Sequence, residues 1–280
     1  MKIKHLLCFI ALCLFFTPGK AQQLSVMTLR NGATVYIWED KSKPDVFGMI
    51  AFKVGSVDDP EQYTGLAHYL EHVMFKGTQT IDALDWEKEK PIYEKIIAKY
   101  DERAALSDPA AREAIDKEIN DLTREAAQYA AGNEFSLLVD HMGGQGLNAS
   151  TGYDQTEYHN SFPPSQLEKW LEIYSERLID PVFRGFQTEL EAVYEEYNMY
   201  NDDRGSRMRE FIYEQAFGDH PYARPIIGLP EHLKNPQLSK LIDFYNTWYG
   251  PQNMSIILVG NIDAKEAIPM IRDKFERVSP

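Results

Sequence analysis

Residues 68–72 read HYLEH and hold three side chains that could carry out hydrolytic chemistry, namely His68, Glu71 and His72. On a helix, positions four apart lie on one face with about 5–6 Å between their Cβ atoms. Both imidazoles can therefore point at one ion, and neutral imidazole is a preferred ligand of Zn²⁺. Glu71 faces the same way. Its carboxylate can take a proton from water activated by the metal and pass it to a leaving amine.

The same five letters could also arise by chance on a surface helix with two solvated histidines, so a third ligand is needed to decide. A hydrolytic zinc site takes three protein ligands and keeps a fourth position open. Residues 188–199 (TELEAVYEEYNM) carry four glutamates, of which Glu189 and Glu196 are seven apart and share a helix face. One of the two can bind the metal while the other supports it. The alternative is an ordinary charged outer helix face.

The helix with the histidines must be held by a larger framework. Strand-like runs stand at residues 24–30, 33–39, 46–54 and 254–259, with two more around a turn within 147–159. Helical patterns stand at residues 66–77, 166–179, 189–200, 208–217, 239–249 and 264–275. Ser165 and Thr188 are expected to cap the helices that follow them. The order of elements predicts an α+β fold, a sheet covered by helices on one face.

Residues 82–131 differ in composition, since they are rich in Ala, Glu, Lys and Asp. Apolar residues recur there at helical intervals on either side of the SDP break at 107–109. This pattern predicts an amphipathic helical hairpin, inserted at about residues 80–134. The hairpin is either a solvated spacer packed on the domain or a docking surface.

The first 21 residues resemble an export signal, with a basic start, an apolar run at residues 6–16 and a Pro-Gly break. The run is too short for a comfortable membrane span, although an uncleaved anchor is the alternative. Both cysteines, Cys8 and Cys13, lie inside this segment. The mature domain, residues 22–280, would then lack disulfides, thiolate ligands and a cysteine nucleophile. We expect a periplasmic or secreted protein without stable membrane insertion after signal cleavage.

Composition and charge narrow the possible partners. The chain has 280 residues, is 44% hydrophobic and carries a formal net charge of −14. The hydrophobic content is enough for a sizeable core. The negative charge argues against a nucleic-acid partner, because no basic surplus exists to neutralise phosphates.

At the motif residues the chain resembles the pitrilysin family of zinc peptidases, the inverzincins, whose zinc motif is H-x-x-E-H. The segment VGSVDDPEQYTGLAHYLEHVMFKGT at residues 54–78 is very similar to the active-site stretch of that family. GGQGLNASTGYDQTEYH, ELEAVYEEYNM, HPYARPIIGLPEHLKN and FYNTWYGPQNMSIILVGNID follow in the family's order. The likeness covers residues 24–276 apart from the hairpin, and secreted bacterial members are the nearest in appearance.

The resemblance implies a role for each matching residue. His68 and His72 match the zinc histidines, and Glu71 matches the general base. Glu196 matches the third ligand and Glu189 the supporting carboxylate, so one Zn²⁺ per chain is expected. Asn148 and Ala149 match the edge-strand pair that holds a substrate backbone in extended form in that family.

The resemblance also implies an assembly. Family enzymes are clamshells of two related halves, and residues 1–280 correspond to the first. We therefore expect a zinc metalloendopeptidase half-enzyme that acts on peptides or unfolded polypeptides. A C-terminal half or a partner subunit would complete its chamber. The alternative is a non-catalytic, zinc-containing domain that binds peptides and docks through the hairpin. Glu71 argues against that alternative, because binding alone needs no base.

Overall fold

A computed structural model describes residues 23–279, which form a six-stranded sheet in the order β1-β2-β6-β3-β5-β4. Strands β2 and β6 are parallel, and the other neighbours are antiparallel. The strands are β1 (Gln23–Thr28), β2 (Thr34–Glu39), β3 (Val46–Phe52), β4 (Gln145–Thr151), β5 (Thr156–Phe162) and β6 (Met254–Gly260). Strand β4 is therefore an edge strand, and its outer side has no partner strand within residues 23–279.

Local sequence chemistry explains the strands. Burial alternates along β3 and β5, as a half-buried sheet requires. Asn31 and Gly32 turn the chain between β1 and β2, and Gly32 has φ +100°, which only glycine adopts easily. The pairing of Thr28 with Thr34 fixes the register of this hairpin. The strands predicted from the sequence are all present.

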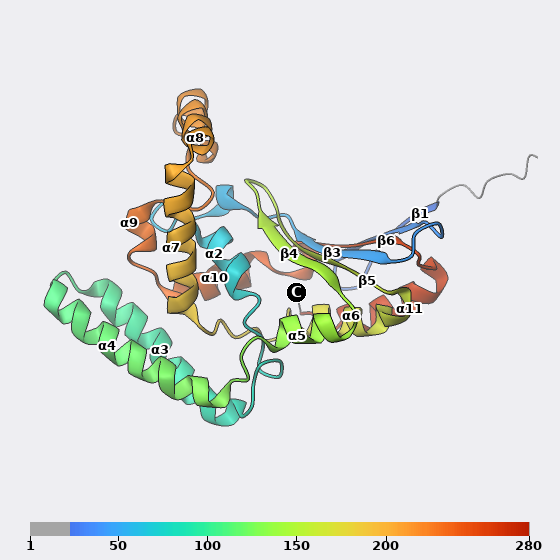
Figure 1. Ribbon diagram of the computed structural model, residues 1–280, viewed down its shortest axis with the longest axis horizontal. Coiled ribbons are helices and arrows are strands. Elements are labelled where there is room, and N and C mark those ends of the chain that lie inside the picture. The colour runs from blue at the N-terminus through green and yellow to red at the C-terminus, as the bar shows by residue number, and fades with distance from the viewer. Residues whose placement is uncertain (1–22, 280) are drawn as a thin grey trace, which may run out of the picture.

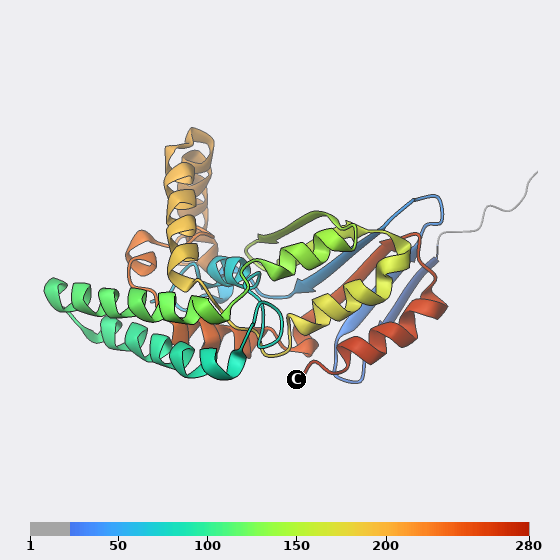
Figure 2. The ribbon, with the colours of Figure 1, turned by 60° about the horizontal axis from the view of Figure 1, so that its bottom comes forward.

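Three helices cover one face of the sheet: α5 (Glu134–His141), α6 (Leu167–Glu176) and α11 (Ala264–Phe275). Figure 2 shows them lying along the same side of the strands. Trp170 of α6 is fully buried and lies so close to β3 that a Cβ at Gly48 would come within 2.5 Å of its ring. Its indole nitrogen donates to Asn160 Oδ1 of β5 at 2.8 Å. The α+β fold with helices on one face is thus confirmed.

A second group of helices stands at the far end of the sheet, where α7 lies beside α2 and leads up into α8 (Figure 1). It comprises α2 (Leu66–Val73), α7 (Phe186–Asp202), α8 (Arg204–Phe217), α9 (Pro230–Leu233) and α10 (Leu238–Trp248). Short 3₁₀ turns link the elements: Ser56–Asp58, Ala127–Tyr129, Pro164–Gln166, Pro221–Ala223 and Pro251–Asn253. No helix within residues 23–279 is long and apolar enough to cross a bilayer. The proposed export signal lies outside the described residues.

The predicted helical hairpin is present as α3 (Trp86–Ala105) and α4 (Pro109–Ala126). Asp85 and Asp108 cap its two helices by accepting hydrogen bonds from Lys88 and Ala111 backbone N–H groups. The hairpin projects from the body of the molecule beside α7 (Figure 1). It also contacts the body near its turn, where the ring of Tyr100, towards the C-terminal end of α3, packs edge-on against Phe186 at 4.8 Å.

Three helix starts differ from the sequence prediction, and one of them is α8, which begins at Arg204 after the Asp203 cap rather than near Met208. Helix α7 begins at Phe186 rather than after Thr188, because Gly185 takes a left-handed conformation (φ +61°) and turns the buried Phe186 onto the core. Ser165 does not cap α6, since residues 164–166 form a 3₁₀ turn that runs into the helix. At α7, tertiary packing of the apolar residue Phe186 against Tyr69 accompanies the earlier helix start.

Candidate metal centre

Helix α2, which carries the histidines, is fixed at its N-terminus by a buried carboxylate. Asp59 accepts hydrogen bonds from the backbone N–H groups of Gly65, at 2.7 Å, and Ala67, at 2.9 Å. These are N–H groups that the first turn of a helix leaves without partners. Burial raises the pKa of Asp59 to about 7, although the two hydrogen bonds act in the opposite direction.

The C-terminal end of α2 is held by a buried cation. Arg177 is 2% exposed and donates to the backbone oxygen of Met74, the C-cap residue, at 3.1 Å. Its guanidinium lies over four aromatic rings at 4.4–5.5 Å from their centroids, those of Phe75, Phe135, Tyr158 and Tyr174. A positive charge at this end of a helix is favourable because it complements the helix dipole. Both ends of α2 are thus tied to the domain.

The three predicted ligands meet at one point. Glu196 Oε2 of α7 lies 3.6 Å from His68 Nε2 and 3.5 Å from His72 Nε2. One ligand atom from each residue lies within 4.8 Å of the others. Tetrahedral zinc, with bonds of about 2.1 Å, separates its ligand atoms by about 3.4 Å. The set His68, His72 and Glu196 therefore has donor atoms that could hold a zinc ion, with the two histidine–glutamate separations close to that spacing.

Burial and neighbouring charges shift the pKa values of His68 and His72 in opposite directions. Burial, aided by the neighbouring His72, lowers the pKa of His68 to about 4, so this ring is neutral and ready to bind a metal. Its Nδ1 atom is buried without a hydrogen-bond partner in residues 23–279. Burial lowers the pKa of His72 as well, but hydrogen bonds to Glu189 and Glu196 outweigh it and raise that pKa to about 9. Metal binding at this site must therefore displace a proton from His72.

Glu189 stands behind His72. Its Oε2 atom lies 3.5 Å from His72 Nδ1, and its Oε1 atom lies 2.5 Å from Lys76 Nζ. Burial acts to raise the pKa of Glu189, but the interactions with His72 and Lys76 lower it overall. A carboxylate on the outer ring nitrogen orients an imidazole and leaves the other nitrogen free for a metal. This is the supporting position predicted for Glu189.

Glu71 projects into the same cavity as the ligands. Its Oε2 atom accepts a hydrogen bond from the Thr151 hydroxyl of β4 at 2.5 Å. Burial raises the pKa of Glu71 while this hydrogen bond opposes the rise. A half-buried carboxylate held at one oxygen keeps the other oxygen available for proton transfer.

The cavity has a volume of about 430 Å³ and opens along the edge strand β4. Ala149 and Thr151 line it, and Ala149 pairs with Tyr158 on the inner side of β4. Asn148 lies on the same strand and is exposed, but it is not part of the cavity wall. Of the two residues predicted to bind a substrate backbone, only Ala149 borders the cavity.

Four residues around the site had no distinctive sequence signal: Lys76, Thr151, Tyr200 and Arg209. Tyr200 lies one helical turn beyond Glu196. The hydrogen bond to His72 holds the pKa of Glu196 below its usual range, and a hydrogen bond from Tyr200 adds to this effect. The i, i+4 spacing of Glu196 and Tyr200 was the only available clue, and it is common on helices.

Comparison with known protein families agrees with this geometry. Residues 34–90 and 122–229 match the family described as insulinase, peptidase family M16, and residues 237–280 match the M16 inactive domain. The chain belongs to peptidase family M16. The unmatched stretch between residues 90 and 122 falls in the α3–α4 hairpin.

Curated relatives of this M16 chain are zinc proteases by name. An uncharacterised zinc protease of Mycobacterium leprae is 26% identical over 79% of this chain and 39% of its own length. The probable zinc protease PqqL of Escherichia coli is 25% identical over 92% of this chain and 23% of its own length. Zinc protease PqqE of Helicobacter pylori is 24% identical over 89% of this chain and 46% of its own length. The chain thus spans less than half of each relative, and the relationship supports a peptidase function.

Solved structures share the fold. A protease from Helicobacter pylori has a TM-score of 0.71 at 22% identity, covering 92% of this chain and 51% of that one. The first half of the periplasmic protease PqqL from Escherichia coli has a TM-score of 0.68 at 24% identity, covering 92% and 47%. Pitrilysin has a TM-score of 0.68 at 22% identity, covering 94% and 23%. The M16 fold is therefore shared with full-length and half-length proteases.

Proposed function

We propose that the chain is the catalytic half of a zinc metalloendopeptidase that hydrolyses peptide bonds. The observation that carries this proposal is the meeting of His68, His72 and Glu196 at ligand spacing, with Glu71 in the same cavity. The zinc protease names of the M16 relatives point to the same metal. A purely peptide-binding domain would need neither Glu71 nor the hydrogen bond that holds it.

Each residue of the site has a proposed role. His68, His72 and Glu196 would hold one zinc ion, which when bound supplies a Lewis acid that polarises the peptide carbonyl and acidifies water. Glu71 takes the proton of the attacking water and returns it to the leaving amine nitrogen. Thr151 keeps Glu71 in place by donating to its second oxygen. Glu189 orients His72 from behind.

The edge strand supplies a substrate site. Among residues 23–279, strand β4 has no partner strand on its outer side, and a peptide can pair with such an edge in extended form. Ala149 lies at the cavity and Asn148 next to it on the same strand, so both would contact the substrate backbone. Backbone pairing depends little on sequence, which suits peptides or unfolded polypeptides as substrates.

Metal analysis of matched variants tests the ligand set. Purified wild-type chain should retain about one zinc after dialysis. Glu196→Gln should weaken zinc binding about a hundredfold or more, because it replaces a charged ligand with a neutral amide. The control is Glu195→Gln, on the exposed face of the same helix. Equal zinc content in the Glu196 and Glu195 variants would remove Glu196 from the site.

A second variant separates catalysis from metal binding. Glu71→Gln should keep its zinc but slow cleavage of a quenched fluorescent peptide by about 10²–10⁴-fold, the usual contribution of a general base. Hydrolysis at the wild-type rate would rule out the proposed role of Glu71.

We further propose that a C-terminal half or a partner subunit completes the chamber, because the curated relatives are more than twice as long as the stretch matched here. Residues 1–280 alone should then bind about one zinc but cleave peptides much more slowly than full-length PqqE assayed beside them. Comparable rates would show that no further half is needed.

We place the protein in the periplasm or outside the cell, as the periplasmic relative PqqL suggests. Residues 1–21 would be removed as a signal peptide, which leaves residues 22–280 as the catalytic domain. Mass spectrometry of the protein recovered from its source cells should find an N-terminus at residue 22. An intact residue 1 in the mature protein would contradict export by cleavage.

A further inference from the structure

One face of α8 forms part of the cavity wall. Ser206, Arg209, Glu210 and Tyr213 all line it, at the i, i+3, i+4 and i+7 positions of a helix. This wall plays no part in holding the metal or moving a proton. It borders the same cavity as Ala149 and Thr151 of β4, the strand with which a substrate peptide is proposed to pair.

Arg209 is the only lysine or arginine that lines this cavity in the described part of the chain. Within residues 23–279 it makes no ion pair, and its Nη2 atom donates only to the Ser206 hydroxyl, at 3.3 Å. The acidic groups that line the same cavity are Glu71, Glu196 and Glu210. The first two already serve the metal centre, so the guanidinium retains donors for a ligand.

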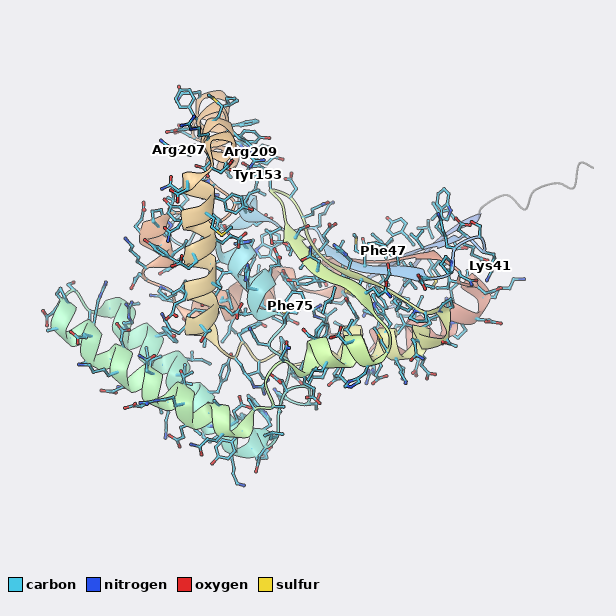
Figure 3. The ribbon with its side chains drawn as sticks, viewed as in Figure 1. Lys41, Phe47, Phe75, Tyr153, Arg207 and Arg209 are labelled. Atoms are coloured by element: carbon cyan, nitrogen blue, oxygen red, sulfur yellow. The ribbon has the colours of Figure 1, made fainter. Side chains whose placement is uncertain are left out.

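Aromatic and aliphatic side chains complete the wall beside Arg209. The rings of Tyr153 and Tyr213 stack with centroids 5.4 Å apart and an interplanar angle of 11°. Tyr222 packs against Tyr153 at 4.8 Å and so fixes the stack from behind. Ile226 and Ile227 lie on the same cavity wall. Figure 3 shows Arg209 and Tyr153 close together where α8 approaches the turn between β4 and β5.

We propose that Arg209 selects substrates with a carboxylate close to the scissile bond, an inference that rests on the proposed peptidase function. The tyrosine stack would pack against the aliphatic part of a glutamate or aspartate side chain, and the guanidinium would pair with its carboxylate. The chain carries a net charge of −14, so its overall field repels acidic peptides. Any preference for them must therefore arise from a local cation such as Arg209.

Binding measurements test this with fluorescent peptides that differ only in Glu or Gln next to the scissile bond. We expect the wild-type chain to bind the Glu peptide about five- to tenfold more tightly than the Gln peptide. Arg209→Gln should abolish this ratio, and Arg209→Glu should invert it, so that the Gln peptide binds more tightly than the Glu peptide. Arg207→Gln is the matched control, because Arg207 is exposed on the same helix but does not line the cavity.

A second pair of Gln peptides, with a free or an amidated C-terminus, distinguishes a terminal carboxylate from a side-chain carboxylate. An equal ratio of affinities in wild type and Arg209→Gln for both peptide pairs would overturn the proposal, as would an equal loss in Arg207→Gln. The readout is affinity, so it does not depend on turnover. Failure of the peptidase function would instead appear as absent zinc or absent cleavage.

Discussion

The buried ion pair between Arg184 and Glu89 makes a testable link between the α3–α4 hairpin and the metal centre. Arg184 Nε and Nη2 donate to the two oxygens of Glu89 at 2.6 and 2.8 Å. The same guanidinium donates to the backbone oxygen of Lys76, just after α2, at 3.2 Å. Arg184 also immediately precedes Gly185, the N-cap of α7. The Arg184 side chain thus connects the hairpin to the segment after α2, and its backbone leads directly into α7, the second helix that carries a proposed metal ligand.

Glu89→Ala should destabilise the protein by about 3–5 kcal/mol, the cost of leaving a buried charge without its partner. The Arg184 and Glu89 side chains are only 9% and 1% exposed, so water cannot replace the lost carboxylate. Urea unfolding in the presence of a chelator, followed by tryptophan fluorescence, measures the change without a contribution from bound metal.

Two further variants sharpen the test. Glu94→Ala, at an exposed position of the same helix, should change the free energy of unfolding by less than about 0.5 kcal/mol. Replacing both partners, with Glu89→Leu and Arg184→Met, should recover most of the stability because no unpaired charge remains. If Glu89→Ala were as mild as Glu94→Ala, the ion pair would not anchor the hairpin.

Three other predictions concern the site itself. Thr151→Val should lower kcat for peptide cleavage about tenfold with zinc content unchanged, because the hydrogen bond that holds Glu71 is lost; an unchanged kcat would contradict that role. Because the folded-state pKa of Asp59 is raised to about 7, above its ordinary value, the folded state keeps a proton that the unfolded state releases. Stability should therefore fall as the pH rises from about 4 to 7, and by less in Asp59→Asn; parallel pH profiles in urea unfolding would refute this. Removal of zinc by a chelator should lower the melting temperature of the wild type but not of Glu196→Gln, as calorimetry would measure.

Local patterns sufficed for most of the elements. The alternation in β3, the Asn31 and Gly32 turn, and the 3.6-residue periodicity on either side of the SDP break each depend on neighbours in sequence. Errors arose where a distant contact moved an element boundary. Helix α7 starts earlier than Thr188 because Phe186 packs on Tyr69, a contact that no local pattern encodes.

The candidate site likewise depends partly on local spacing and partly on the fold. The spacing of His68, Glu71 and His72 on one helix face fixes their relation before any tertiary contact forms. The spacing of Glu189 and Glu196 likewise made them a pair, but it left open which one would bind metal. The fold favours Glu196 as the proposed ligand, because α7 lies beside α2 with Glu196 at both Nε2 atoms and Glu189 at the outer nitrogen of His72.

The sequence by itself thus determined which residues are proposed as metal ligands, since ligand type and helical spacing are properties of short segments. Only the tertiary structure could bring Thr151 to Glu71, Lys76 to Glu189 and Arg209 into the cavity wall. These residues come from the edge strand β4, the turn that follows α2, and helix α8, whose mutual positions depend on how the whole core packs. Threonine, lysine and arginine are common on surfaces, so their roles follow from position and not from residue type.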